Sequence, residues 1–212
     1  GKVISHTYLV ESIIGRGGMG VVYRATHLRT GGSFAIKMLC KDVSEQPDMI
    51  RRFREEALTV SQIRHPHIVQ VTDFSMTEDG CPYIAMEFLD GEDLQQRLER
   101  ERVLPLPLAL ELTRQVGSAL HAAHQCRVVH RDVKPHNIFL INRQIGNTDD
   151  QIAKVLDFGI AKMMQTARMT QEDMILGTPQ FMSPEAAQGR CDEIDGRSDQ
   201  FALGVVLYRA LT

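Results

Sequence analysis

The sequence predicts an α+β protein in which a strand-rich part is followed by a helix-rich part. Up to about residue 88, short runs of β-branched and aromatic residues alternate with turns such as Thr30-Gly31-Gly32. After Asp90-Gly91, apolar residues recur every three or four positions, as they do along one face of a helix. This change of period predicts two lobes joined by a short link.

The composition is that of a globular domain and excludes several classes of protein. The 212 residues are 43% hydrophobic and 24% charged, with a net charge of -3. That charge gives no reason to expect a nucleic acid or an anionic membrane as partner, and no apolar run approaches the roughly 18 residues of a membrane span. The four cysteines lie far apart without a Cys-x-x-Cys pair, which favours reduced thiols in a cytoplasmic protein over a zinc or disulfide framework.

The strand-rich part is expected to hold one helix. The pattern predicts strands at 8–10, 13–14, 21–25, 33–37, 68–71 and 83–88. Between the fourth and fifth of these, Phe53, Ala57 and Val60 form one apolar stripe of a helix that starts at Pro47. His65-Pro66 ends the helix, because a residue before proline is pushed out of the helical region.

The helix-rich part is expected to open with a short helix carrying Leu94 and Leu98. Pro107 suits the first position of a longer helix. A polar loop over residues 142–151 is predicted between strands at 138–141 and 154–156. A last helix begins near Ser198 and is apolar on nearly all sides over residues 201–212, which is typical of a helix inside a lobe.

A glycine cluster follows the strands predicted at 8–10 and 13–14, as Gly15-x-Gly17-x-x-Gly20-x-Val22. Glycines let a backbone turn tightly and bring its N–H groups against phosphate oxygens, although dinucleotide-binding folds and ordinary hairpins share this pattern. The residues after it read as a strand rather than a helix, which favours a hairpin over a nucleotide. Lys37 ends a later strand and either reaches water or, paired with Glu56 on the next helix, binds phosphates.

The string from His130 to Asn137, His-Arg-Asp-Val-Lys-Pro-His-Asn, is the strongest motif in the chain. Within it, the Asp132 carboxylate can deprotonate a hydroxyl, Lys134 can offset phosphate charge, and the Asn137 oxygen can bind a metal. Asp157-Phe158-Gly159 follows twenty residues after Asn137 and supplies a second metal-binding carboxylate. Together these groups predict a phosphoryl-transfer centre.

In this order and spacing, with Ser183-Pro184-Glu185 after them, the motifs resemble the protein kinase superfamily, and most closely the bacterial eukaryotic-like Ser/Thr kinases. The resemblance implies a bilobal protein-kinase-like fold, with a small antiparallel β lobe holding one helix and a mainly α-helical large lobe. It places the kinase domain at 8–212, with the N-lobe at 8–86, the hinge at 87–90 and part of the C-lobe at 91–212. The family's later helices are then expected beyond Thr212, so that the C-lobe is incomplete.

The resemblance also assigns roles within a site that uses ATP and Mg²⁺ (or Mn²⁺) to phosphorylate a Ser or Thr of a protein substrate. Asp132 is the catalytic base, Lys134 neutralises γ-phosphate charge, Lys37 pairs with Glu56, and the metal is held by Asn137 and Asp157. The implied ATP-binding residues are Ile14, Gly15, Gly17, Gly20, Val22, Ala35, Lys37, Met86, Glu87, Leu89, Asp93 and Phe139.

Further roles concern activation and support of the site. Arg131 is expected to pair with a phosphate in the activation loop, at Thr170 or, as the second candidate, Thr166. Asp199 is expected to anchor the backbone of the catalytic loop, and Glu185 to pair with an arginine of the later helices.

Two other functions compete with an active protein kinase. A catalytically silent nucleotide-binding or scaffolding fragment is the alternative, and it is disfavoured because Lys37, Asp132, Asn137 and Asp157 are all present. A small-molecule phosphotransferase is disfavoured by the segment 177–185, which resembles the part of a kinase that shapes a peptide groove.

Overall fold

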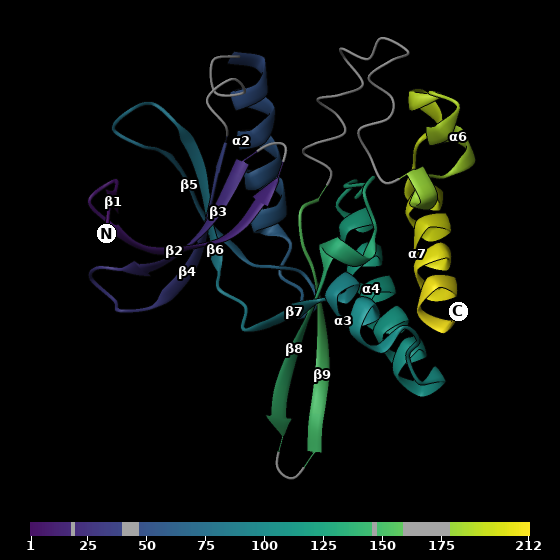
Figure 1. Cartoon of the computed structure of the whole chain (residues 1–212). Helices are drawn as coiled ribbons and strands as arrows, with labels where there is room; N and C mark the ends of the chain where they lie inside the picture. The colour runs from purple at the N-terminus through teal and green to yellow at the C-terminus, as the bar shows by residue number, and fades with distance from the viewer. Residues whose placement is uncertain (18–19, 40–46, 146–147, 159–178) are drawn as a thin grey trace. The chain divides into compact units, whose positions relative to one another are not determined.

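A computed structural model describes residues 1–17, 20–39, 47–145, 148–158 and 179–212. They form two compact units (Figure 1). The first unit consists of Gly1–Arg64 with Val69–Leu89, and the second of His65–Ile68 with Asp90–Thr212. Among the described residues, no helix has both the length and the apolar character that crossing a bilayer requires.

The first unit is built on a six-stranded antiparallel sheet in the order β1-β2-β3-β4-β6-β5. The strands are β1 (Val3–Ile4), β2 (Tyr8–Gly17), β3 (Gly20–His27), β4 (Ser33–Leu39), β5 (Val71–Met76) and β6 (Pro82–Glu87). One face of the sheet buries a core that includes Tyr8, Ala25, Ile36 and Tyr83. The predicted strand-rich part is thus confirmed, with β1 as an additional edge strand.

Strand β2 runs unbroken through the two pieces predicted at 8–10 and 13–14. Its pairing with β3 shifts register between Val10 and Ser12 and again between Ile13 and Gly15. Each shift is a bulge that adds one residue to β2, Glu11 in the first and Ile14 in the second. The bulges break the alternation of apolar residues, and this is why the sequence pattern divides the strand.

The single helix of this unit is α2 (Pro47–Gln62). Its predicted stripe is buried, since Phe53, Ala57 and Val60 are all at most 5% exposed. The Phe53 ring meets Phe74 of β5 edge-on, with 5.7 Å between ring centroids. The helix starts at Pro47, as predicted, and ends before His65-Pro66.

The strand predicted at 68–71 is wrong. Ile68 and Val69 are buried like strand residues, yet regular pairing with β6 begins only at Val71. Ile68 instead forms an isolated parallel bridge with Val155 in the second unit. Here burial and strand pairing are separate properties, and the sequence pattern reports only burial.

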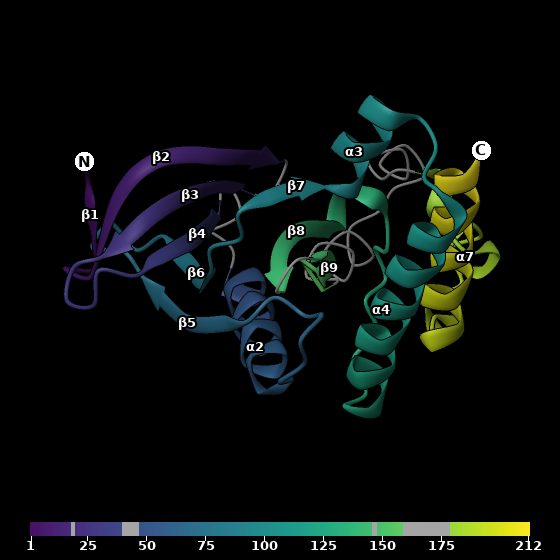
Figure 2. The same cartoon turned by 90° about the horizontal axis from the view of Figure 1, so that it is seen from below.

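The second unit holds three longer helices, α3 (Leu94–Glu101), α4 (Leu106–Gln125) and α7 (Gly196–Leu211). Shorter helices are η1 (Pro135–Asn137), η3 (Pro179–Phe181), α6 (Pro184–Ala187) and η4 (Cys191–Glu193). Helices α4 and α7 lie side by side (Figure 2). Pro107 stands one residue inside α4, and α7 begins two residues before Ser198.

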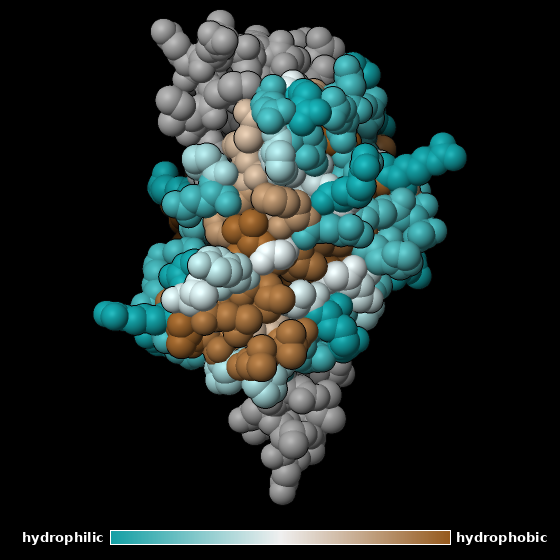
Figure 3. Space-filling view, turned by 90° about the vertical axis from the view of Figure 1, so that its right-hand side faces the viewer, coloured by the Kyte–Doolittle hydropathy of each residue, from teal (hydrophilic) through white to brown (hydrophobic). Residues whose placement is uncertain are grey.

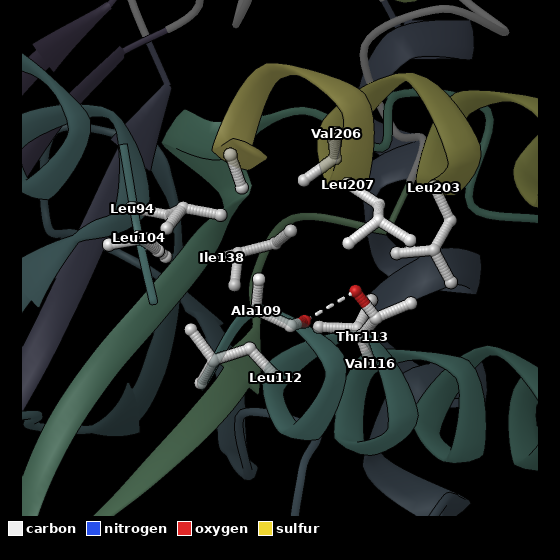
Figure 4. A pocket seen from close by; sticks show the side chains of 11 residues that line it. Leu94, Leu104, Ala109, Leu112, Thr113, Val116, Ile138, Leu203, Val206 and Leu207 are labelled. Carbon is white, nitrogen blue, oxygen red and sulfur yellow. Dashed lines mark hydrogen bonds between the residues drawn. The ribbon is translucent and has the colours of Figure 1, made fainter. Parts of the chain in front are cut away.

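A small cavity of about 10 Å³ remains where α3, α4 and α7 meet (Figure 4). Its walls are almost entirely aliphatic, and the one hydroxyl there, on Thr113, donates to the Ala109 carbonyl oxygen at 2.7 Å. A space that barely admits one water and offers it no polar partner stays empty. This cavity is a packing defect rather than a ligand site.

Helix α7 is apolar on most of its surface, as predicted, but only one side of it is buried in the described part of the chain. Ala202, Val206 and Ala210 are at most 5% exposed, whereas Phe201 and Tyr208 are 45% and 69% exposed. Figure 3 shows the face of the molecule on which α7 lies, with apolar side chains gathered in its middle and polar ones around them.

A three-stranded sheet completes the second unit, with strands β7 (Gly91–Asp93), β8 (Ile138–Ile145) and β9 (Thr148–Val155). The polar loop predicted at 142–151 is wrong, because its residues continue the β8–β9 hairpin, with Asn142 paired to Gln151. The sequence is polar at nearly every position there, so no alternation of apolar and polar residues marks the strands. Gly91 has to be glycine, since a Cβ at this position would lie 2.0 Å from the Leu140 carbonyl oxygen.

Candidate active site

The sheet of the first unit gathers several predicted ATP-binding residues on one face. Val22 lies directly opposite Lys37, and Ala35 lies directly opposite Met86. Cross-strand partners share a face, as do residues two apart on one strand. Val22, Ala35, Lys37 and Met86 therefore lie on the face opposite to the core, which we call the nucleotide face.

Glycine is favoured at the three positions of the cluster for different physical reasons. A Cβ on Gly20 would lie 2.0 Å from the Met38 carbonyl oxygen, so the sheet itself requires glycine there. A Cβ on Gly17 would meet nothing within 4 Å, and one on Gly15 would touch only Val22, at 3.7 Å. The described residues thus leave space above Gly15 and Gly17, as the close approach of a ligand requires.

The segment expected to be the hinge is tied to the start of β5. The Glu87 backbone N–H donates to the Gln70 carbonyl oxygen at 3.0 Å. The Gln70 backbone N–H donates in return to the Glu87 carboxylate at 2.8 Å. These two bonds fix the course of the backbone that the resemblance assigns to adenine.

The catalytic loop brings Asp132, Lys134 and Asn137 together. The Lys134 ammonium lies 2.7 Å from an Asp132 carboxylate oxygen, and the Asn137 amide nitrogen donates to the same oxygen at 3.0 Å. The Asn137 amide also donates to the Asp132 carbonyl oxygen at 2.8 Å. Both side chains thus hold the carboxylate in a defined orientation, as a general base requires.

Asp199 of α7 holds the backbone of this loop by hydrogen bonds. Its carboxylate is 1% exposed and accepts hydrogen bonds from the backbone N–H groups of His130 and Arg131, each at 2.8 Å. A third bond, at 2.7 Å, joins it to the His124 ring at the end of α4. Arg131 has a φ of 64°, a left-handed conformation that is rare outside glycine and is held here by the bond to Asp199.

His130 is fully buried, and its neighbours determine its tautomer. The Asp132 backbone N–H donates to Nδ1 at 3.2 Å, and Nε2 lies 2.8 Å from the Leu156 carbonyl oxygen. Nδ1 accepts and Nε2 donates, so the ring is neutral. The ring also packs on Phe158, with 4.7 Å between centroids, and so joins the catalytic loop to the Asp-Phe-Gly segment.

The residues expected to hold a metal fit a hard cation. Asn137 and Asp157 offer oxygen ligands, which Mg²⁺ prefers. Because both bonds from Asn137 to Asp132 use the amide nitrogen, the amide oxygen is the atom that can ligate a cation. The Leu156 N–H donates to the Asn137 carbonyl oxygen at 2.9 Å, and Asp157 follows with a φ of 48°.

Two further ATP-site candidates face each other across strands of the second unit. Asp93 of β7 is paired with Phe139 of β8. One oxygen of the Asp93 carboxylate accepts from the Gln96 N–H at 2.9 Å and caps α3. The resemblance implies only an ATP-binding role for Asp93, although the motif Asp-x-x-Gln can signal this capping role.

Several predicted residues lie outside the described part of the structure. They are Thr166, Thr170, the dipeptide 177–178 and the side chain of Glu56. Glu185 is described and does have a partner, although not the expected arginine. The Ser198 hydroxyl donates to its carboxylate, and this bond is the main cause that lowers the pKa of Glu185.

Comparisons with known proteins show the family of this chain. A family model described as "Protein kinase domain" matches residues 8–212. The chain is 41% identical to the serine/threonine-protein kinase pkn3 of Myxococcus xanthus, with all of this chain and 39% of that protein covered. It is 39% identical to PknA of Mycobacterium tuberculosis, again over its whole length and over 48% of the relative.

Solved structures show the same fold. The kinase domain of Mycobacterium tuberculosis PknI superposes with a TM-score of 0.77 at 31% identity, with 100% of this chain and 76% of that one covered. The chain belongs to the protein kinase domain family, and its fold is the α+β protein kinase fold. Members of this family use ATP with a divalent metal ion, and the relatives named above are bacterial Ser/Thr kinases.

Proposed function

We propose that this chain is the catalytic part of a bacterial Ser/Thr protein kinase that transfers the γ-phosphate of ATP to a Ser or Thr hydroxyl of a protein substrate. The observation that carries the proposal is the Asp132 carboxylate held by both Lys134 and Asn137. The chain spans 39% of the length of pkn3 and 48% of that of PknA, so the proposal concerns this domain.

The second unit supplies the groups for phosphoryl transfer. Asp132 takes the proton of the attacking hydroxyl, and its orientation is set by the bond from the Asn137 amide. Lys134, 2.7 Å from the same carboxylate, offsets negative charge that moves onto the transferred phosphate. Asp199 keeps the loop backbone in place while these charges change.

The first unit supplies the groups for the nucleotide. Gly15 and Gly17 leave room for phosphates, Val22 and Ala35 cover adenine, and Lys37 binds the α- and β-phosphates with Glu56 as its partner. Ile14, Met86, Glu87 and Leu89 complete the adenine contacts of this unit. In the second unit, Asp93 meets the ribose and Phe139 forms the floor of the adenine pocket. Asn137 and Asp157 would hold a Mg²⁺ or Mn²⁺ ion, which would supply positive charge to offset the negative charge of the phosphates.

Two substitutions test the proposal. Asp132→Asn keeps the hydrogen bonds of the loop but removes the base, so kcat is expected to fall by roughly 10²- to 10⁴-fold with little change in ATP affinity. Asp157→Ala is expected to abolish Mg²⁺-dependent nucleotide binding. Phosphorylation of casein with radiolabelled ATP and calorimetric titration with Mg·ATP measure the two effects.

Asp192→Asn is the matched control, because this aspartate is exposed in η4 and belongs to no part of the site. Near-parental phosphorylation by Asp132→Asn would contradict the assignment of the base. Nucleotide binding without any phosphorylation by the parent protein would instead support the catalytically silent alternative.

The activation mechanism is part of the proposal. Thr170 is the main autophosphorylation site, Thr166 a second one, and Arg131 pairs with the phosphate through its guanidinium. Mass spectrometry of the active protein is expected to find phosphate on Thr170, and an unmodified Thr170 in fully active protein would contradict this role. The domain boundaries 8–86, 87–90 and 91–212, and a cytoplasmic location, also remain proposals.

A further inference from the structure

Arg24 is a charged residue on the nucleotide face to which the sequence analysis gives no role. It lies two residues after Val22 on β3 and directly opposite Ala35 of β4. Residues two apart on a strand point to the same side of a sheet. Arg24 therefore belongs to the same face as the predicted adenine-binding residues, at the end away from the glycine cluster.

The Arg24 guanidinium makes two contacts of different kinds. Its Nε atom lies 2.9 Å from a carboxylate oxygen of Glu11, and its Cζ atom lies 4.7 Å from the ring centroid of Phe88. A guanidinium is planar, so its edge can donate to a carboxylate while its face covers an aromatic ring. Phe88 lies between Glu87 and Leu89, within the segment proposed to bind adenine.

Glu11 is held in position independently of Arg24. It is the extra residue of the first bulge in β2, and such bulges redirect a side chain out of the regular strand alternation. Its second carboxylate oxygen accepts from the Thr26 hydroxyl on β3. The carboxylate is thus a fixed point on the sheet, and it determines where the guanidinium lies.

The hinge segment is consequently held by two independent sets of contacts. The bonds between Glu87 and Gln70 fix it to the start of β5. The chain of contacts from Thr26 through Glu11 and Arg24 to Phe88 fixes it to the middle of the sheet. The Arg24 and Glu11 side chains are 44% and 37% exposed, so their ion pair alone stabilises the fold little.

We propose that Arg24 is a positioning residue for the nucleotide, which sets the distance between the adenine-binding backbone of residues 87–89 and the nucleotide face by holding the ring of Phe88. This role rests on the proposed function, since it presupposes that adenine binds at that backbone. Without Arg24 the segment keeps only the bonds between Glu87 and Gln70, and the nucleotide has to order the part around Phe88, which weakens binding. The groups that transfer phosphate are unchanged, so the rate of the bound complex is unchanged.

The substitution Arg24→Met tests the proposal, because it removes the charge and keeps the length of the side chain. We expect the Kd for Mg·ADP and the KM for ATP to rise about two- to fivefold, with kcat unchanged. Arg24→Lys keeps the cation without the planar group and should give an intermediate Kd. Arg29→Met, at an exposed position in the turn after β3, is the matched control and should leave both constants unchanged.

A double-mutant cycle with Phe88→Leu separates positioning from general stability. The two substitutions are expected to be non-additive in the free energy of Mg·ADP binding, because each removes the same contact. A lower Tm with parental Kd and KM for Arg24→Met would overturn the inference and leave a purely structural residue, and strictly additive effects would also overturn it. A parent protein that binds no Mg·ADP would overturn the proposed function itself before any variant is compared.

Discussion

The catalytic loop and the β8–β9 hairpin are neighbours in the chain, yet their backbones are held in opposite ways. The loop has irregular backbone, with Arg131 in the left-handed region, and is held by side chains from elsewhere in the sequence, above all Asp199. The hairpin has regular backbone, and among its described residues beyond Ile141 the two strands pair only with each other. The conformation of the loop therefore depends on the identity of particular residues, whereas that of the far end of the hairpin depends on backbone pairing.

This contrast explains why the sequence predicts the catalytic loop but not the far end of the hairpin. A loop held by particular side chains needs particular residues, and those residues form a motif. Backbone pairing between polar strands accepts many residues, and so leaves no motif. The four predictions below test this difference.

The largest effect is expected for Asp199→Asn. The amide keeps one oxygen and presents an NH2 group in place of the other, so one of the two backbone N–H groups of His130 and Arg131 loses its acceptor. We expect the free energy of unfolding to fall by about 2–4 kcal/mol. Urea titration measures the change, Asp192→Asn is the exposed control, and a loss below about 0.5 kcal/mol would contradict the anchoring role.

The next effect concerns the root of the hairpin, where Glu92 of β7 is paired with Leu140 of β8. Hydrogen bonding to Arg100, together with Arg97, lowers the pKa of Glu92 to about 2, despite partial burial that acts against ionisation. A lowered carboxyl pKa stabilises the fold above the ordinary value near 4.5, and this contribution is lost as the pH falls towards 2.

We therefore expect Glu92→Gln to lower the free energy of unfolding by roughly 1–2 kcal/mol at pH 7, with a smaller difference from the parent at pH 3. Urea titrations at both pH values check this. Glu99→Gln on the exposed side of α3 is the control. A difference that stays constant with pH would show that the ion pairs do not hold the hairpin root.

A smaller and stabilising effect is expected just before the catalytic loop. Arg127 follows α4 with a φ of 60°, and its side chain is exposed. Glycine adopts this conformation without steric cost, so Arg127→Gly should raise the free energy of unfolding by about 1 kcal/mol. Arg127→Ala keeps the Cβ atom and should bring no gain. Equal effects of the two substitutions on thermal unfolding would show that the backbone here is unstrained.

The smallest effect is expected at the far end of the hairpin. Asn142 and Gln151 are paired across the hairpin. Replacing residues 143–150 with Asn-Gly would connect them by a two-residue turn and so shorten the hairpin. We expect the free energy of unfolding to change by less than about 0.5 kcal/mol, with the phosphorylation rate unchanged. A large loss in either measurement would show that this end carries contacts beyond its own pairing.

The sequence alone predicted the fold class, the α2 helix with its buried stripe, and the motifs of the catalytic loop. Each rests on local information, either an apolar stripe of period three to four or residue types that chemistry demands at fixed spacing. Apolar periodicity gave a wrong prediction in two places. Ile68 and Val69 are buried but lie outside regular strand pairing, and residues 142–151 belong to strands although their sequence does not alternate.

Only the tertiary structure decided the roles that depend on partners distant in the chain. Ser198 turned out to be a partner of Glu185, and Arg24 to lie over Phe88. Neither contact follows from spacing, because each needs strands or helices brought together by packing. The sequence by itself determined which residues can do the chemistry. The fold decided which atoms of these residues form hydrogen bonds or ring contacts. Such contacts depend on distances of a few ångströms, which a linear pattern does not contain.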